Sequence, residues 1–414
     1  MRNFPEGWVE TTLGEYIKVK HGFAFKGEFI TGQPTNNILV TPGNFLVGGG
    51  FKSDKFKYFS GDVPNEYVLN HLDIIVTMTD LSKKGDTLGY PALVPKSDSV
   101  VYLHNQRIGL VEVLDNGLDK DFLYWLLRTR VYQKTIINSS TGSTVRHTSP
   151  SRMQEYSFNL PPLPEQKTIA DMLSSFDEKI ELLREQNKTL ETLAQTIFKE
   201  WFVHFNYPDA TGEMVDSELG EIPNGWRVGR LGEEFDIVLG QSPKGSSYNE
   251  SGDGMVFYQG RAEFQKRFPK RRLYTTEPKR LAEKYDVLMS VRAPVGDINV
   301  ASEKCCIGRG LAAIHSNKKA YALYKMVSLS SHFDLFESEG TVFGSINKKS
   351  LEGIEVVIPS KEVINDFEAA ASAVDKKIFN NAQQIQTLSQ TRDTLLPKLM
   401  SRQVRVEGAK GKAS

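Results

Sequence analysis

A chain of 414 residues has room for two or three domains, and its hydrophobic fraction of 39% is that of a folded protein. It carries 51 Lys and Arg against 51 Asp and Glu. This balance argues against a histone-like protein that coats polyanions nonspecifically, but it allows a local basic surface. No apolar run approaches the roughly 18 residues that cross a bilayer, and no apolar leader follows Met1, so we expect a soluble, cytoplasmic protein.

Residues 1–160 form the first predicted domain. Short β-branched or aromatic runs such as Ile38-Leu39-Val40 alternate with turns rich in Gly, Pro, Asn and Asp. This pattern predicts strands joined by loops, with a helix or two, such as Asp121–Thr135.

Residues 161–206 form the first predicted spacer helix. After Pro161-Pro162-Leu163-Pro164 the turn residues vanish, and apolar positions recur in alternating steps of four and three. This heptad pattern predicts a coiled-coil helix from Glu165 to about Val203, about 58 Å long. The predicted seam residues are Ile169, Leu173, Phe176, Ile180, Leu183, Asn187, Leu190 and Ile197.

The chain then repeats itself. Phe4-Pro5-Glu6-Gly7-Trp8 reappears as Ile222-Pro223-Asn224-Gly225-Trp226, a shift of 218, and a strand-like run at 72–76 resembles 285–289. We therefore predict two diverged copies, with a second domain over 207–358, a second spacer helix over 359–406 and a tail over 407–414.

The second helix repeats the seam of the first at a shift of 198. Its predicted seam residues are Phe367, Val374, Ile378, Asn381, Ile385, Leu388 and Leu395. Asn187 and Asn381 fall on the two seams, where a polar residue fixes the register of pairing. Pro397 is expected to kink or fray the last turn.

Two seams in one chain favour mutual packing over the alternative, in which each helix packs on its own globular half. The predicted fold is α+β: two pseudo-repeated α/β domains separated by two long helices that form an antiparallel coiled coil.

Motifs of catalysis are missing from the sequence. We find no phosphate-binding G-x-x-x-x-G-K-[ST] loop, no dinucleotide fingerprint, no nucleophile elbow and no adenine-methyltransferase motif. The adjacent Cys305 and Cys306 have no second Cys/His pair with which to bind zinc. We predict no catalytic residue, no metal site and no cofactor of the chain's own.

Three features of the sequence carry a resemblance to a known family. They are the P-x-G-W and L-G-E segments that open each half, the segment His21–Lys26, and L-P-P-L-P-E-Q-x-x-I-A at Leu160–Ala170. The chain resembles the specificity subunit of type I restriction–modification systems over essentially its whole length. In the second copy the L-P-P-L-P-E-Q stretch has degenerated at Ile358–Val363, so the resemblance there depends on register.

The resemblance implies a non-catalytic protein that binds double-stranded DNA. Two target-recognition domains would each read half of a bipartite, asymmetric site, and the helices would act as a ruler. Two modification (adenine methyltransferase) subunits and the restriction subunits (an ATP-dependent nuclease and translocase) would be its partners. S-adenosylmethionine, ATP and Mg would bind those subunits.

Candidate DNA contacts are basic or imidazole side chains in or near Gly-, Ser- and Thr-rich loops, because phosphates attract Lys and Arg, and Arg reads base edges. In the first domain they are Lys26, Lys83, Lys84, Arg107, Arg146 and His147. In the second they are Lys244, Arg261, Lys266, Arg267, Arg271, Arg292, Arg309 and Lys348, several of them in the basic stretch Arg261–Lys284.

Three questions stay open on the sequence. The apolar residues outside the seam, such as Met172, Phe198 and Phe202, fit either a partner surface or packing against the second domain. Arg107 and Arg309 precede similar Gly-Leu pairs and fit either DNA contacts or internal salt bridges. The rival functions are a two-domain coiled-coil adaptor that binds no DNA, and an unrecognised nuclease.

Overall fold

The computed structural model describes residues 7–82, 84–142, 144–333 and 344–405. The chain divides into two compact units. The first unit comprises Met1–Glu181 and Gln386–Ser414, and the second comprises Leu182–Ile385. Each long helix therefore contributes one half to each unit.

The first unit is built on two sheets. One has four antiparallel strands in the order β2-β11-β7-β9, and the other has five in the order β3-β5-β4-β10-β6, in which β10 runs parallel to β4. Two short pairs, β1-β13 and β8-β12, complete it. The elements are β1 (Val9–Thr12), β2 (Ile17–His21), β3 (Ile30–Thr31), β4 (Asn37–Val40), β5 (Lys57–Phe59), β6 (Val68–Leu69), β7 (Ile74–Thr77), β8 (Thr79–Asp80), β9 (Pro91–Leu93), β10 (Val101–His104), β11 (Ile108–Val113), α1 (Lys120–Leu127), α2 (Arg130–Ser139), β12 (Arg146–His147), α3 (Pro150–Gln154) and β13 (Ser157–Leu160).

The second unit repeats this plan. Its sheets have the orders β17-β25-β22-β23 and β18-β20-β19-β24-β21, again with a single parallel pair between described strands, β19 with β24. The matching strand orders confirm the predicted duplication. The elements are β14 (Met214–Val215), β15 (Ile222–Pro223), β16 (Arg227–Arg230), α5 (Leu231–Glu234), β17 (Asp236–Leu239), β18 (Tyr248–Asn249), β19 (Met255–Tyr258), β20 (Leu273–Thr275), β21 (Leu281–Ala282), β22 (Val287–Ser290), β23 (Ile298–Val300), β24 (Cys305–Ile307), β25 (Leu311–His315), α6 (Lys319–Ser328), α8 (Lys348–Glu352) and β26 (Glu355–Ile358).

The position of β7 between two cores explains the apolar run Ile74-Ile75-Val76 in its sequence. Side chains alternate between the two faces of a strand. Ile74 and Val76 enter the core that holds the helices, whereas Ile75 enters a second core against the five-stranded sheet. In the second unit Val287 and Met289 of β22 face one core and Leu288 the other. Both faces are covered, so the first three positions of each strand are apolar.

The predicted helical segment Asp121–Thr135 falls in two helices, α1 and α2. The first ends at Leu127, and Thr129 caps the second: its hydroxyl oxygen accepts a hydrogen bond of 3.2 Å from the Tyr132 amide.

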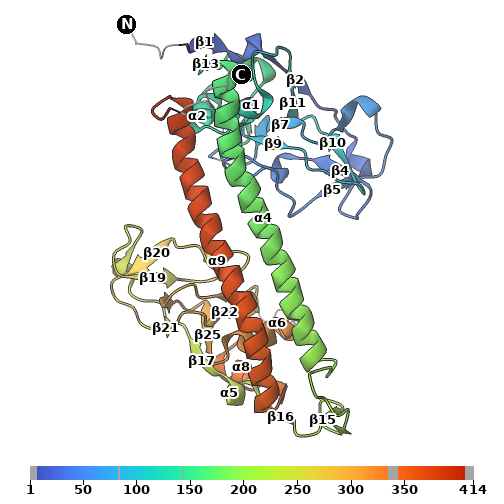
Figure 1. Ribbon diagram of the computed structural model, residues 1–414, viewed down its shortest axis with the longest axis vertical. Helices are drawn as coiled ribbons and strands as arrows, with labels where there is room; N and C mark the ends of the chain where they lie inside the picture. Colours follow the sequence, from blue (N-terminus) through green and yellow to red (C-terminus); the bar gives the residue numbers. More distant parts are fainter. Residues whose placement is uncertain (1–6, 83, 143, 334–343, 406–414) are drawn as a thin grey trace, which may run out of the picture. The chain divides into compact units, whose positions relative to one another are not determined.

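The two long helices are α4 (Leu163–Phe202) and α9 (Lys361–Met400), each of 40 residues and so about 60 Å long. In the first unit Ile169 and Leu173 near the start of α4 share a core with Leu396 and Leu399 near the end of α9. In the second unit the end of α4 packs against the start of α9 through Phe198 and Phe367, whose ring centroids are 5.4 Å apart. The helices are therefore antiparallel within each unit (Figure 1). All the predicted seam residues are buried or half-buried.

The seam asparagines contact each other. Asn381 is 0% exposed, and its Nδ2 donates to Asn187 Oδ1 and to Gln186 Oε1, both at 2.8 Å. Its own Oδ1 is buried without a partner. An amide pair in the seam accepts only one alignment of the helices, so this contact fixes their register.

The L-P-P-L-P-E-Q motif joins the first domain to α4. Trp8 Nε1 donates to Glu165 Oε2 at 3.1 Å. The buried Gln166 amide accepts from Asp119 N at 2.8 Å and donates to Gly117 O and Pro161 O at 2.9 and 2.8 Å. In the second copy, the buried Val363 replaces Glu165 at the shift of 198. The motif is therefore a structural joint.

The far end of α4 answers one of the open questions. Phe198 and Phe202 are buried in the core of the second unit, and the Phe202 ring lies 6.0 Å from that of Trp226. They pack against the second domain. The exposed apolar side chains on α4 are Met172, Leu182 and Leu193.

Candidate nucleic-acid interface

The first unit brings four of the predicted DNA contacts to one edge. Strand β12, which is Arg146 and His147, pairs with β8, and the preceding Met78 amide donates to Arg107 O at 2.9 Å. Lys84 lies in the loop that follows β8. We name Lys84, Arg107, Arg146 and His147 the first basic edge. Residues distant in sequence thus meet where β7 leaves the sheet.

The loop that carries Lys84 is held from within by Asp80. This buried carboxylate accepts hydrogen bonds from the amides of Ser82 (2.6 Å) and Thr87 (2.5 Å) and from the Thr87 hydroxyl (2.7 Å). Burial alone raises the pKa of Asp80, but these hydrogen bonds outweigh it and hold the pKa below its ordinary value. The loop therefore presents Lys84 on a preorganised turn, which lowers the entropic cost of binding.

The turn that carries Arg107 is closed by the buried His104. Its Nε2 lies 2.8 Å from Ile108 O and donates to it, while Nδ1 is buried without a partner. Burial lowers the pKa of His104 to about 4, so the ring is neutral at physiological pH. The turn is also packed tightly: a Cβ at Gly22 would lie 2.2 Å from Asn105 O.

The second unit has the equivalent edge. The Val291 amide donates to Gly310 O at 2.9 Å, Arg292 forms a bridge with Ser345, and the Arg309 amide donates to Ser242 Oγ at 3.3 Å. We name Arg292 and Arg309 the second basic edge. Their side chains are exposed, and the described residues include no ion-pair partner for either.

Two pairs of basic residues, one member from each copy, differ in whether their positions are equivalent. Lys26 and Lys244 are equivalent, since each immediately precedes the short 3-10 turn before β3 or β18. Arg107 and Arg309 are offset by one residue, because Ile108 pairs with Thr77 whereas Leu311 pairs with Ser290. Among the described residues, neither Arg107 nor Arg309 forms the internal salt bridge that the sequence left open.

Arg267 is a correction to the predicted set. Its side chain is only 12% exposed, and its guanidinium lies 2.5 Å from Asp375 of α9 and 4.0 Å from Glu191 of α4. A guanidinium enclosed by two carboxylates cannot also contact DNA, so we remove it from the candidates.

Three other predicted contacts of the second domain already have ion-pair partners. Arg261, Arg271 and Lys348 are exposed but paired with Asp297, Glu303 and Glu352 at 2.6, 2.5 and 3.3 Å. Lys266 is exposed and lies near α4: burial raises the pKa of Glu191 on that helix, and the charges of Arg267 and Lys266 oppose this rise. In the first domain, Lys83 lies outside the described residues.

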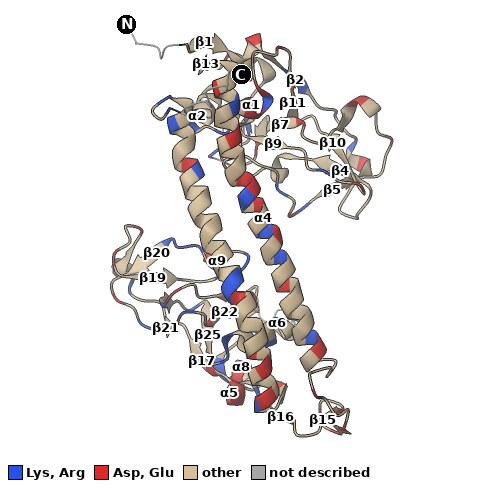
Figure 2. Cartoon of the chain, in the orientation of Figure 1, with Lys and Arg blue, Asp and Glu red and all other residues tan. Residues whose placement is uncertain are grey.

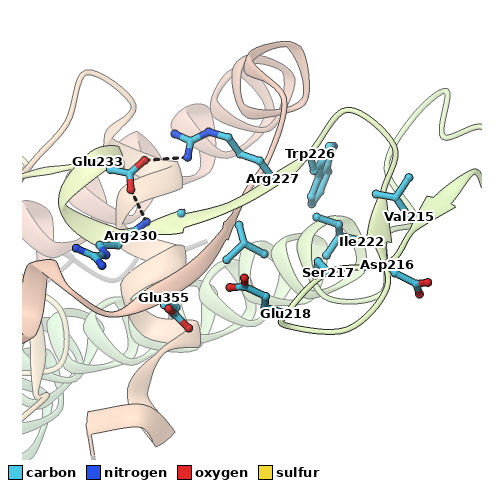
Figure 3. A pocket seen from close by; sticks show the side chains of 12 residues that line it. Val215, Asp216, Ser217, Glu218, Ile222, Trp226, Arg227, Arg230, Glu233 and Glu355 are labelled. Carbon is cyan, nitrogen blue, oxygen red and sulfur yellow. Dashed lines mark hydrogen bonds and ion pairs between the residues drawn. The ribbon is translucent and has the colours of Figure 1, made fainter.

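A cavity of about 540 Å³ in the second unit does not suit a phosphate (Figure 3). Its lining includes the carboxylates of Asp216, Glu218, Glu233 and Glu355, and Arg227 is 2.8 Å from Glu233. The excess of negative charge repels a nucleic-acid backbone. Figure 2 shows both acidic and basic side chains on each long helix, so neither helix is a uniformly basic surface.

The described part of the chain contains no group of three or more His, Cys, Asp or Glu side chains that could hold a metal ion. None of its helices combines the length and the apolar character needed to cross a membrane.

Comparison with known proteins identifies the family. A model of the type I restriction modification DNA specificity domain matches residues 5–192 and again 223–390. The chain belongs to this family and carries its domain twice.

Two relatives and a solved structure show how far the similarity extends. The chain is 34% identical over 313 residues to a Methanocaldococcus jannaschii protein provisionally named the MjaX type I restriction enzyme specificity subunit, covering 74% of this chain and 73% of that one. It is 24% identical over 429 residues to the HindI specificity subunit of Haemophilus influenzae, covering 83% and 93%. The type I S subunit of M. genitalium shares the fold, with a TM-score of 0.60 at 20% identity over 96% and 97% of the two chains.

Sequence reasoning missed Arg128, Asp177 and Asp375, which form buried or half-buried ion pairs at the long helices. One signal was present: Asp177 and Asp375 are separated by the helix repeat of 198.

Proposed function

We propose that this chain is the DNA-reading specificity subunit of a type I restriction–modification enzyme and binds a bipartite, asymmetric site. Residues 1–160 and 207–358 are the proposed target-recognition domains, and 161–206 and 359–406 the spacer helices. The observation that carries the proposal is the repeated basic edge: both copies present exposed arginines where the central strand, β7 or β22, ends. Exposed guanidinium groups on turns, such as those of Arg107, Arg292 and Arg309, suit phosphates and the guanine edge.

Chemistry belongs to the partners in this proposal. Two modification subunits transfer the methyl group from S-adenosylmethionine to adenine, and the restriction subunits use ATP and Mg for cleavage. The chain supplies the choice of site. A location in the cytoplasm, where the partners meet DNA, follows from this role.

The test is duplex binding by the chain assembled with its modification subunit, over a range of salt concentrations. Each phosphate contact contributes about −0.9 to the log–log salt slope. Arg292→Ala combined with Arg309→Ala is expected to weaken binding and to flatten the slope by up to about two units if both contact phosphates. Arg227→Ala removes an exposed arginine that is paired with Glu233 and is the matched control.

Two results would overturn the proposal. An adaptor would show no duplex affinity in the assembled complex, and a nuclease would cut DNA with a metal ion in the absence of any partner. Equal losses of duplex affinity in the Arg292→Ala, Arg309→Ala double variant and in Arg227→Ala would reject the second basic edge as the contact surface.

A further inference from the structure

An ion-pair cluster joins the first recognition domain to both long helices. Asp177 of α4 accepts a hydrogen bond of 2.5 Å from Arg128 Nη1, at the end of α1, and is also paired with Arg392 of α9. The Arg128 guanidinium lies over the Trp125 ring, 4.3 Å from its centroid, and its Nε donates to Gly48 O at 2.9 Å. We name Arg128, Asp177 and Arg392 the first clamp.

The second unit contains a cluster of the same kind. Asp375 of α9 accepts 2.5 Å and 2.7 Å hydrogen bonds from Arg267 Nη2 and the Tyr324 hydroxyl. The Arg267 guanidinium lies 5.6 Å from the centroid of the Tyr324 ring and 4.0 Å from Glu191 of α4. We name Arg267, Asp375 and Glu191 the second clamp.

The two clamps share the carboxylate position but not the source of the cation. Asp375 is Asp177 shifted by the helix repeat of 198. The arginine comes from the end of α1 in the first unit and from the loop between β19 and β20 in the second. Simple inheritance of a contact would preserve both partners. Retention of the carboxylate with a relocated arginine indicates that both domains need a charge-assisted attachment at this point of the helix.

Each clamp also leads directly to the basic edge of its own unit. In the first unit Arg128 is followed by α2, whose Gln133 Nε2 donates to Gly85 O at 3.1 Å in the loop that carries Lys84. In the second, the Val300 amide of β23 donates to Arg267 O at 2.9 Å, and β23 follows the loop that carries Arg292. A shift at either clamp is therefore passed through one element to the candidate DNA contacts.

We infer that the two clamps fix the orientation of each recognition domain on the helices, and so determine the spacing between half-sites that the assembled enzyme accepts. This inference rests on the proposed function. Asp177 and Asp375 act as positioning residues, since they reach DNA only through the edges that they hold. Loss of one clamp leaves the DNA-contacting side chains present but lets their domain, and the basic edge that it carries, rotate on the helices.

The experiment uses the full chain assembled with its modification subunits. Methylome sequencing first defines the wild-type site, and duplexes are then made with the spacer lengthened or shortened by about one base pair, one step of the helix. The variants are Asp177→Asn and Asp375→Asn, which keep the side-chain shape but remove the charge. Glu178→Gln and Asp366→Asn alter exposed carboxylates on the same helices and are the matched controls.

The expected result is a loss of discrimination. We compare the ratio of methylation at sites with an altered spacer to methylation at sites with the native spacer. In each clamp variant this ratio should be about tenfold higher than in wild type, which is the lower range of the effect of a hydrogen bond to a charged group. Asp177→Glu, which keeps the charge, should restore most of the preference. Hydrogen exchange of residues 84–89 should accelerate in Asp177→Asn and stay unchanged in Glu178→Gln.

The outcomes separate the two proposals. If the wild-type complex shows no bipartite site, the proposed function fails. If it shows one, but the clamp variants keep the spacing preference or lose methylation equally at all spacings, the clamps only stabilise the fold and the inference is overturned.

Discussion

The amide pair in the seam gives a prediction whose magnitude follows from its contacts. Replacement of Asn381 by leucine removes two hydrogen bonds, to Asn187 and Gln186, each contributing about 1 kcal/mol net. Asn187 is half-buried and would be left without a donor at a cost of about 1 kcal/mol, whereas the exposed Gln186 rehydrates. Burial of the leucine returns about 2 kcal/mol. The single variant should be less stable by about 1 kcal/mol.

The double variant Asn187→Leu with Asn381→Leu should behave differently. Asn187→Leu also removes the amide that the single variant leaves without its donor, and two leucines meet in the seam. Replacement of both members of a polar pair by apolar groups is neutral or stabilising, so the double variant should be at least as stable as wild type. The coupling energy between the two sites should reach at least about 1 kcal/mol.

Hydrogen exchange of the α4 and α9 amides around these residues measures the local opening free energy without requiring the whole chain to unfold in one step. Asn380→Leu changes the neighbouring exposed asparagine and should have little effect. Additive single and double variants, with zero coupling, would refute the view that the amide pair determines the register.

Three further predictions concern a turn, a joint and the helices. Stability should fall by up to about 3 kcal/mol from pH 6.5 to pH 4, because His104 has its pKa lowered to about 4 and the unfolded chain takes up the proton first; His104→Gln should flatten this part of the pH profile in chemical denaturation. Gln166→Leu should destabilise the first unit by about 3 kcal/mol, since three hydrogen bonds of a buried amide are lost, and exchange of the β1 and β13 amides would reveal it; unchanged protection contradicts the joint. One heptad inserted into both α4 and α9 adds about 10 Å, close to three base pairs, to each helix, so methylome sequencing should find a longer unread spacer, and an unchanged one counts against the ruler.

The sequence by itself determined the features that repeat. Duplicated openings and two seams at a shift of 198 predicted two domains and two long helices, because heptad spacing depends only on helix geometry. Two seams in one chain favoured mutual packing of the helices, and the structure shows their antiparallel direction within each unit. The same periodicity placed Asn187 and Asn381 in the seam, and the structure shows them joined.

Tertiary structure decided which charges are available. Arg267 and Arg292 look alike in the sequence, yet one is enclosed by Asp375, 108 residues away, and the other is exposed on a turn. Likewise Phe202 and Leu193 are apolar residues of one helix, and only the first meets the core of the second domain. Local periodicity shows which face of a helix is apolar, but the availability of a side chain depends on partners brought close by folding, and those long-range contacts leave no mark on local spacing.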